Sequence, residues 1–162
     1  MLEIQRIGAD RWQVFRNLRL AALADAPYAF ASRLDKEREL SETDWRDRAT
    51  SRTQFVALLD GTPVGLVGVR PEEGDHVQVV SMWVAPEARG TGASDRLLAA
   101  AIDEAKASGS ASVGLWVSDG NTPAERLYAR HGFARSGNVQ PIDDEDPSRG
   151  MEFEMRLSLP QP

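Results

Sequence analysis

Apolar residues along the chain follow two spacings, one typical of strands and one typical of helices. Short apolar or alternating runs predict strands at Leu2–Ile7, Phe55–Leu59, Val64–Val69, Val77–Val84, Val113–Val117 and Met151–Leu159, with a further strand opening at Phe133. Helical spacing follows Asp10, surrounds Trp45, and recurs from Leu97 to Ala105 and from Thr122 to about His131. Because both kinds of element are mixed along the chain without an internal repeat, the pattern predicts a mixed α/β domain around one sheet.

Capping and turn residues support these boundaries. Asp10 is placed to cap the first helix, and Ser41–Asp44 forms a variant capping box with Asp in place of the usual Glu. Thr122-Pro123 is expected to cap and begin the last helix, which Gly132 ends. Asp60-Gly61 between two apolar runs indicates a hairpin.

Composition narrows the class of protein. With 162 residues the chain is long enough for a sizeable core, so residues 1–162 are expected to form a single domain. It has no cysteine and only two histidines, which excludes a disulfide framework, a cysteine nucleophile and a histidine-rich metal site. A net charge of −6 argues against non-specific binding to nucleic acid. Neither a long apolar span nor a signal-peptide core occurs, so the sequence predicts no membrane contact and a cytoplasmic location.

The stretch Val79–Leu98 is the most informative part of the chain. A buried strand ends at Pro86, and the loop Arg89–Ser94 contains Gly90 and Gly92 before a helix begins. Glycine lets the backbone approach a ligand closely, and the unpaired amides at a helix N-terminus favour an anion. The loop therefore indicates a phosphate or pyrophosphate site, with a plain strand–helix turn as the alternative. It is not a Walker A loop, and it lacks the full Gly-x-Gly-x-x-Gly pattern of dinucleotide-binding folds.

A second motif lies downstream, Asn121-x-x-Ala124-x-x-Leu127-Tyr128-x-x-x-Gly132-Phe133. Together with Arg89-x-x-Gly92-x-Ser94 and the preceding Ser81-Met82-Trp83-Val84-x-Pro86, it resembles the signatures of the GNAT superfamily of N-acetyltransferases, which use acetyl-CoA. The resemblance covers residues from about 77 to 133, and the N-terminal quarter carries no superfamily signature.

The resemblance implies a single N-acetyltransferase domain over residues 1–162. Its central sheet is expected to be twisted and mostly antiparallel, with about six or seven strands flanked by about four helices. Two parallel central strands are expected to splay apart in a V.

The resemblance also implies roles for individual residues. The backbone of Met82, Trp83 and Val84 is expected to pair with the pantetheine arm like an added strand. Asn121 either contacts the cofactor arm or is a turn residue beside a helix cap. Tyr128 is either the general acid that protonates the departing thiolate or a packed aromatic residue. The pyrophosphate of acetyl-CoA is expected to rest on the amides of Arg89, Gly90, Thr91, Gly92, Ala93 and Ser94.

The acceptor side of the site is less defined. Tyr28 and Phe30 either line the acceptor pocket or anchor a loop, and the acidic run 143–146 either attracts a cationic amine or forms a solvated loop. Gln78 stands where relatives often have a glutamate, and glutamine cannot accept a proton at neutral pH. The general base stays unassigned, because several nearby groups could act through water: Glu72, Glu73, Asp75, His76 and Asp119.

The sequence therefore predicts an acyltransferase that passes the acetyl group of acetyl-CoA to the primary amine of a small molecule by direct attack, without a covalent enzyme intermediate or a metal. A peptide or protein N-acetyltransferase and a non-catalytic acyl-CoA-binding regulatory module are the alternatives. A long acidic groove would favour a peptide acceptor, and a closed pocket would favour a small molecule. Relatives are often dimers, which leaves a homodimer open, and the sequence does not name the acceptor.

Overall fold

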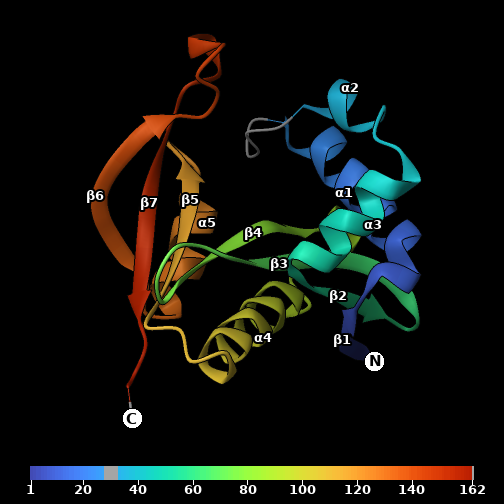
Figure 1. The fold of residues 1–162 in the computed structure, drawn as a ribbon, viewed down its shortest axis with the longest axis horizontal. Coiled ribbons are helices and arrows are strands. Elements are labelled where there is room, and N and C mark those ends of the chain that lie inside the picture. The colour runs from blue at the N-terminus through green and yellow to red at the C-terminus, as the bar shows by residue number, and fades with distance from the viewer. Residues whose placement is uncertain (28–32, 162) are drawn as a thin grey trace.

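A seven-stranded mixed sheet forms the centre of the protein (Figure 1). The computed structural model describes residues 1–27 and 33–161. The strands are β1 (Leu2–Ile7), β2 (Thr53–Leu59), β3 (Thr62–Pro71), β4 (His76–Val84), β5 (Ser112–Ser118), β6 (Ala134–Pro141) and β7 (Met151–Ser158). Their order is β1-β2-β3-β4-β5-β7-β6, and every neighbouring pair is antiparallel except β4 and β5. The expected mixed α/β fold with a mostly antiparallel sheet is confirmed.

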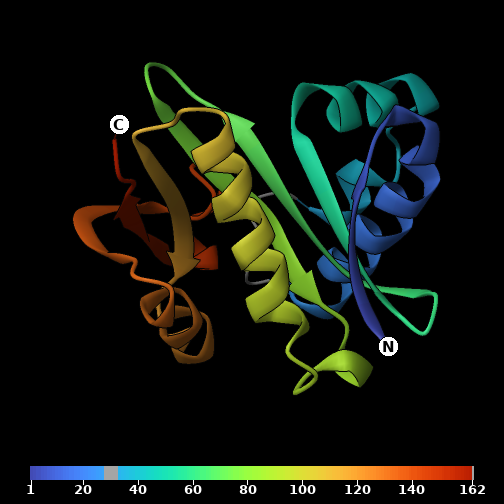
Figure 2. The same ribbon diagram turned by 90° about the horizontal axis from the view of Figure 1, so that it is seen from below.

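Helices cover both faces of this sheet. They are α1 (Trp12–Asp25), α2 (Leu34–Glu37), α3 (Glu42–Ser51), α4 (Ala93–Ala107) and α5 (Thr122–Arg130). Helices α1, α2 and α3 lie over one face, and α4 crosses β3 and β4 on the other face (Figure 1, Figure 2). None of the described helices has the length and apolar composition that crossing a membrane requires.

The sheet opens between its two parallel strands. β4 pairs with β5 only from His76 to Gln78, opposite Ser112 to Gly114. Both strands continue beyond this point without pairing with each other, β4 to Val84 and β5 to Ser118. The half made of β1, β2, β3 and β4 therefore diverges from the half made of β5, β7 and β6, as Figure 1 shows. The expected V-shaped splay is confirmed.

The N-terminal helices pack through aromatic residues. Trp45 of α3 is fully buried and meets Phe15 of α1 edge-on, with 5.4 Å between the ring centroids. Helix α3 begins at the predicted capping box, in which Ser41 and Asp44 each accept the other's backbone amide through the side chain. The aromatic contact joins α3 to α1, which in turn packs on β3.

Two predicted helix starts are wrong. Asp10 lies in a 3-10 turn that precedes α1, and the residue at the N-cap of α1 makes no capping hydrogen bond. Asn121, not Thr122, caps α5, because its side-chain oxygen accepts the amide of Ala124. Residue types at a helix start place the cap only to within a residue or two. Helix α2 is not predicted by the pattern, because four residues are too few to show a helical period.

Candidate active site

The free end of β4 carries a bulge at Ser81. Its φ of 58° lies in the left-handed region, which costs a non-glycine residue about 1–2 kcal/mol. The register against β3 shifts at the same place, between Leu66 and Gly68. Arg19 of α1 donates from Nη1 to the Ser81 hydroxyl across 3.2 Å. A buried side chain from the helical layer therefore holds the bulge.

A glycine turn follows β4 and leads into α4. Gly90 and Gly92 have φ values of 82° and 88°, and a Cβ on either residue would meet nothing within 4 Å among the described atoms. Gly92 is the N-cap of α4, and no side chain within the described chain bonds to that end. The first amides of α4 therefore lie at the positive end of the helix dipole without a capping partner, which favours an anion.

A cavity of about 460 Å³ lies between the end of β4, the glycine turn and α5, and we call it the Asn121 cavity. Six of the predicted cofactor-binding residues line it: Met82, Trp83, Val84, Arg89, Ser94 and Asn121. The other four lie in the adjoining turn and not in the lining: Gly90, Thr91, Gly92 and Ala93. The Thr91 hydroxyl donates to a carbonyl of the turn and Ala93 is buried, so these two residues can offer a ligand their backbone rather than their side chains.

Two arginine side chains that line the Asn121 cavity are each bonded to a carboxylate. Arg89 donates to Asp25 at 2.7 Å, and the indole of Trp83 donates to the same oxygen at 2.9 Å. These bonds, that of Trp83 most, lower the pKa of Asp25 below its usual value. Arg130, which the sequence reading missed, also lines the cavity and pairs with Asp95 at 3.0 Å. Both arginines are thus fixed beside the cavity through Nη2, and no described residue bonds to their other N–H groups, which suit a phosphate.

Asn121 is a helix cap and a cavity residue at once. Its Oδ1 accepts the amide of Ala124 at 3.4 Å, which is the capping role considered from the sequence. Its side-chain nitrogen makes no hydrogen bond to any described residue, and Asn121 is one of the residues that line the Asn121 cavity. The contact with a cofactor arm stays a prediction.

A second cavity, of about 420 Å³, adjoins β4, and we call it the arginine cavity. Residues Gln78 to Met82 of β4 form part of its wall. Two carboxylates, Glu37 and Glu152, line it together with four arginines: Arg19, Arg48, Arg52 and Arg70. The acidic run 143–146 lies in the connection between β6 and β7 and is not part of this lining. The cavity is therefore rich in positive charge and is not the long acidic groove that would favour a peptide acceptor.

Glu37 organises two of these arginines. It is 1% exposed and accepts hydrogen bonds from Nε and Nη2 of Arg19, each at 3.0 Å. Arg48 donates to the same carboxylate at 2.9 Å. Because Arg19 also bonds to Ser81, this buried group joins the three N-terminal helices to the bulge of β4.

Tyr128 and Met82 line both cavities. Tyr128 is 7% exposed, and its ring packs edge-on against Phe133 with 6.0 Å between the centroids. Burial raises the pKa of the Tyr128 phenol to about 12, so the hydroxyl keeps its proton at neutral pH. The junction of the two cavities therefore carries a phenolic hydrogen-bond donor.

The groups considered as a base from the sequence lie away from this junction. Glu72, Asp75 and His76 line a separate cavity at the N-terminal end of β4. Glu73 and Asp119 line neither the Asn121 cavity nor the arginine cavity. None of these five residues therefore shares a cavity with the Tyr128 hydroxyl.

Two residues of the arginine cavity are relevant to proton transfer. Gln78 is buried, and its Nε2 lies 3.3 Å from the Nε2 of His76. Glu152 of β7, which the sequence reading missed, accepts a hydrogen bond from Gln140 at 2.6 Å. Burial raises the pKa of Glu152, although the Gln140 bond acts in the opposite direction. A raised pKa makes a carboxylate a better proton acceptor.

Tyr28 and Phe30 lie outside the described residues, so their place at an acceptor pocket stays a prediction.

The sequence did not predict the arginines of the arginine cavity, because they come from separate parts of the chain. One signal was available. Arg19 follows Phe15 by four residues and precedes Ala22 by three, so it interrupts the apolar face of its helix.

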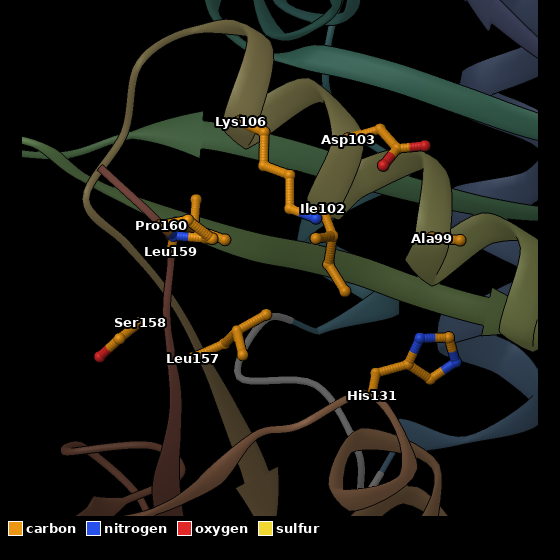
Figure 3. A pocket seen from close by; sticks show the side chains of 9 residues that line it. All are labelled: Ala99, Ile102, Asp103, Lys106, His131, Leu157, Ser158, Leu159 and Pro160. Carbon is orange, nitrogen blue, oxygen red and sulfur yellow. The ribbon is translucent and has the colours of Figure 1, made fainter. Parts of the chain in front are cut away.

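Figure 3 shows a third cavity, of about 320 Å³, between α4 and the end of β7. Its lining includes Lys106 of α4, His131 and Leu157, and it contains none of the predicted site residues. His131 is also in contact with Asp95, with 2.9 Å between Nε2 and Oδ1. This cavity is separate from the junction at Tyr128.

The sheet that opens between its parallel strands has the same fold as solved acetyltransferases. The model of the acetyltransferase (GNAT) family matches residues 17–133. The chain belongs to this family.

Individual relatives agree with this assignment. Mycothiol acetyltransferase of Brachybacterium faecium is 32% identical over 134 residues, which are 80% of this chain and 38% of that protein. The chain thus spans less than half the length of that relative. A GNAT-family acetyltransferase from Streptococcus pneumoniae has a TM-score of 0.82 at 18% identity, over 99% of this chain and 100% of the other. The PaiA N-acetyltransferase of Thermoplasma acidophilum, solved with coenzyme A, has a TM-score of 0.70 at 14% identity, over 98% and 99% of the two chains.

Proposed function

We propose that the protein transfers the acetyl group of acetyl-CoA to the primary amine of a small molecule by direct attack. The observation that carries the proposal is the junction of two cavities at Met82 and Tyr128. One cavity adjoins a turn that favours an anion, and the other holds charged side chains suited to a polar acceptor. Membership of the family and the coenzyme A complex of the Thermoplasma acidophilum protein support acetyl-CoA as the donor.

The Asn121 cavity suits acetyl-CoA in three respects. β4 is unpaired with β5 beyond Gln78, so its backbone can bond to the amides of the pantetheine arm. The open space beside Gly92 and the uncapped start of α4 suit the pyrophosphate. Arg89 and Arg130 supply positive charge at the lining. These groups would bind the thioester and orient it toward Tyr128.

The reaction forms a carbon–nitrogen bond and breaks the carbon–sulfur bond of the thioester. A backbone N–H on the free part of β4 would polarise the carbonyl oxygen. Tyr128 would donate its hydrogen bond to the departing sulfur and pass a proton to it. Since its pKa of about 12 exceeds the value of about 8.5 for a thiol, complete transfer is favourable only if the phenol regains the proton that the amine loses. Tyr128 would therefore act in a relay.

We propose Glu152 as the group that takes a proton from the acceptor ammonium, directly or through one water. It lines the arginine cavity, and burial raises its pKa toward the working range. Glu37, the other carboxylate of the lining, is bonded to Arg19 and Arg48 and is less able to accept a proton.

Replacing Glu152 with glutamine should lower kcat/KM by about a hundredfold at neutral pH, because a positioned base typically contributes that much or more. The wild-type kcat/KM should rise with pH as Glu152 loses its proton, and the variant should lack this limb of the profile. Glu145→Gln is a matched control, since Glu145 is exposed in the connection between β6 and β7. An identical pH profile in E152Q and wild type would exclude Glu152 as the base.

Replacing Gly92 with alanine should weaken coenzyme A binding by about tenfold or more, because the methyl group would enter the space left for the pyrophosphate. Its φ of 88° also strains the variant, so the control must carry the same strain. Gly61→Ala provides it, since Gly61 has a φ of 85° and equally open surroundings in a distant hairpin. Calorimetry should show weak binding in G92A alone. Equal coenzyme A affinities in G92A and G61A would show that the glycine turn is not part of the cofactor site.

The central test is a screen of small amines and short peptides with acetyl-CoA as donor, in which thiol release and the acetylated product are both measured. A small acceptor is favoured because the arginine cavity holds about 420 Å³ and is not an acidic groove. A non-catalytic module would bind acetyl-CoA in calorimetry and release no thiol above the acceptor-free rate. Acetylation of peptides in preference to every small amine would support a peptide or protein N-acetyltransferase.

The cytoplasmic location stays a prediction.

A further inference from the structure

The arginine cavity contains a concentration of positive charge that the transfer of an acetyl group does not itself require. Its lining carries four arginines: Arg19, Arg48, Arg52 and Arg70. Glu37 bonds to two of them, so one negative charge is shared between Arg19 and Arg48. Arg70 reaches a carboxylate, that of Glu72, only at 3.5 Å, and both side chains of that pair are largely exposed. Among the described residues of the lining, four arginines stand against two carboxylates, those of Glu37 and Glu152, so the cavity has a surplus of positive charge.

Arg52 is the member of the cluster with the fewest contacts. Within residues 1–27 and 33–161 it forms no ion pair, and its buried Nε has no hydrogen-bond partner. Burial, followed by the charges of Arg48, Arg70 and Arg19, lowers its pKa to about 10. A buried donor without a partner, beside like charges, costs stability unless a ligand supplies the missing acceptor.

The strand register places Arg52 and Arg70 at the closed end of the V. Arg70 is paired with Gln78, the last residue of β4 that still pairs with β5. Arg52 directly precedes the pair formed by Thr53 and Val69, and therefore lies next to Arg70. Met82 lies four residues further along β4, roughly 13 Å at the usual rise of a strand. The guanidinium groups lie at the ends of long side chains, so the distance that a ligand must span is shorter than this backbone distance. One small molecule could therefore reach from the guanidinium groups to the junction at Tyr128.

On the basis of the proposed function, we propose that the acceptor amine carries an acidic group, a carboxylate or a phosphate, which Arg52 and Arg70 bind at the closed end of the arginine cavity. The amine of the same molecule then points toward Tyr128 and Glu152. Guanidinium groups suit this role, because their planar donors match the two oxygens of a carboxylate or phosphate. Such an acceptor differs from the cationic amine considered for the acidic run 143–146, which does not line the cavity.

Matched pairs of amines test the proposal in turnover. One arm compares amino acids with their carboxamides, and the other compares phosphoethanolamine with ethanolamine. In wild type the acidic member of at least one arm should have a kcat/KM about tenfold or more above that of its neutral partner. Arg52→Gln should remove this preference, because it should raise KM for the acid about tenfold more than KM for the neutral amine. Arg52→Lys should restore part of it. Equal or better use of the neutral member in both arms would overturn the proposal.

Direct binding separates this proposal from the proposed function. Inorganic phosphate and succinate are titrated in a calorimeter with saturating coenzyme A present, so that the glycine turn is already occupied. Wild type should bind at least one anion, and Arg52→Gln should bind it about tenfold or more weakly. Arg46→Gln is the control. Arg46 lies on α3, the helix that Arg52 follows, but it pairs with Glu42 at the surface. Binding without any acetylation would leave the anion site standing and refute the proposed function. Absent binding in wild type, or equal binding in wild type and R52Q, would refute the anion site. A melting temperature of R52Q no lower than that of wild type shows that weaker binding in the variant is not a loss of fold.

Discussion

Replacing Tyr128 with phenylalanine is expected to lower kcat by about a hundred- to ten-thousand-fold, the usual contribution of a positioned acid. The substitution keeps the ring that packs against Phe133 and removes the hydroxyl at the junction of the two cavities. Coenzyme A affinity should therefore change little. The loss should lie at the lower end of the range, because a thiolate with a pKa of about 8.5 is already a tolerable leaving group.

The leaving group provides the control for this prediction. An acetyl thioester whose thiol has a lower pKa needs less help from a proton donor. With such a thioester as the acetyl donor, the ratio of the wild-type rate to the Y128F rate should therefore be smaller than with acetyl-CoA. The wild-type pH profile should show no loss of activity from Tyr128 ionisation near neutral pH, since burial raises the pKa of its phenol to about 12. Unchanged kcat in Y128F, under conditions where chemistry limits turnover, would leave Tyr128 as a packing residue.

The strand end and the glycine turn beside the Asn121 cavity could be predicted from the sequence because their signals are local. The strand at Val79–Val84, the glycines of the turn and the motif that begins at Asn121 are each contiguous. Local chemistry also identified the capping box of α3 correctly. The same local reasoning misplaced the cap of α5 by one residue, since Asn121 and Thr122 are both good capping residues.

The arginine cavity could not be predicted in the same way. Its arginines come from α1, α3, β3 and the start of β2, and only the tertiary fold brings them together. β7 shows a second reason. Alternation in its sequence suggests that Met151 points inward and Glu152 outward, yet Met151 is 44% exposed and Glu152 is 9% exposed. A polar residue faces inward here because the opened sheet provides a cavity for it, and the hydrophobic pattern of a single strand does not contain that information.

Replacing Glu37 with leucine is expected to lower the free energy of unfolding by about 3–5 kcal/mol, the usual cost of removing one partner from a buried ion pair. Glu37 is 1% exposed and bonds to both Arg19 and Arg48, so its loss leaves the buried Arg19 charge without this carboxylate. Urea denaturation followed by tryptophan fluorescence would measure the change. Glu42→Ala is the control, because its ion pair with Arg46 is exposed and should contribute at most about 1 kcal/mol.

A double replacement tests whether the charge itself is responsible. Arg19→Met combined with Glu37→Leu removes both members of the buried pair, and Arg48, which is 29% exposed at its side chain, can be solvated instead. The double variant should therefore be more stable than Glu37→Leu alone, since the buried Arg19 charge is no longer left without its carboxylate. It should still lose acetyl transfer, because the hydrogen bond from Arg19 to Ser81 that holds the bulge of β4 is gone. A double variant less stable than the single one would mean that Glu37 acts mainly through packing and not through its charge.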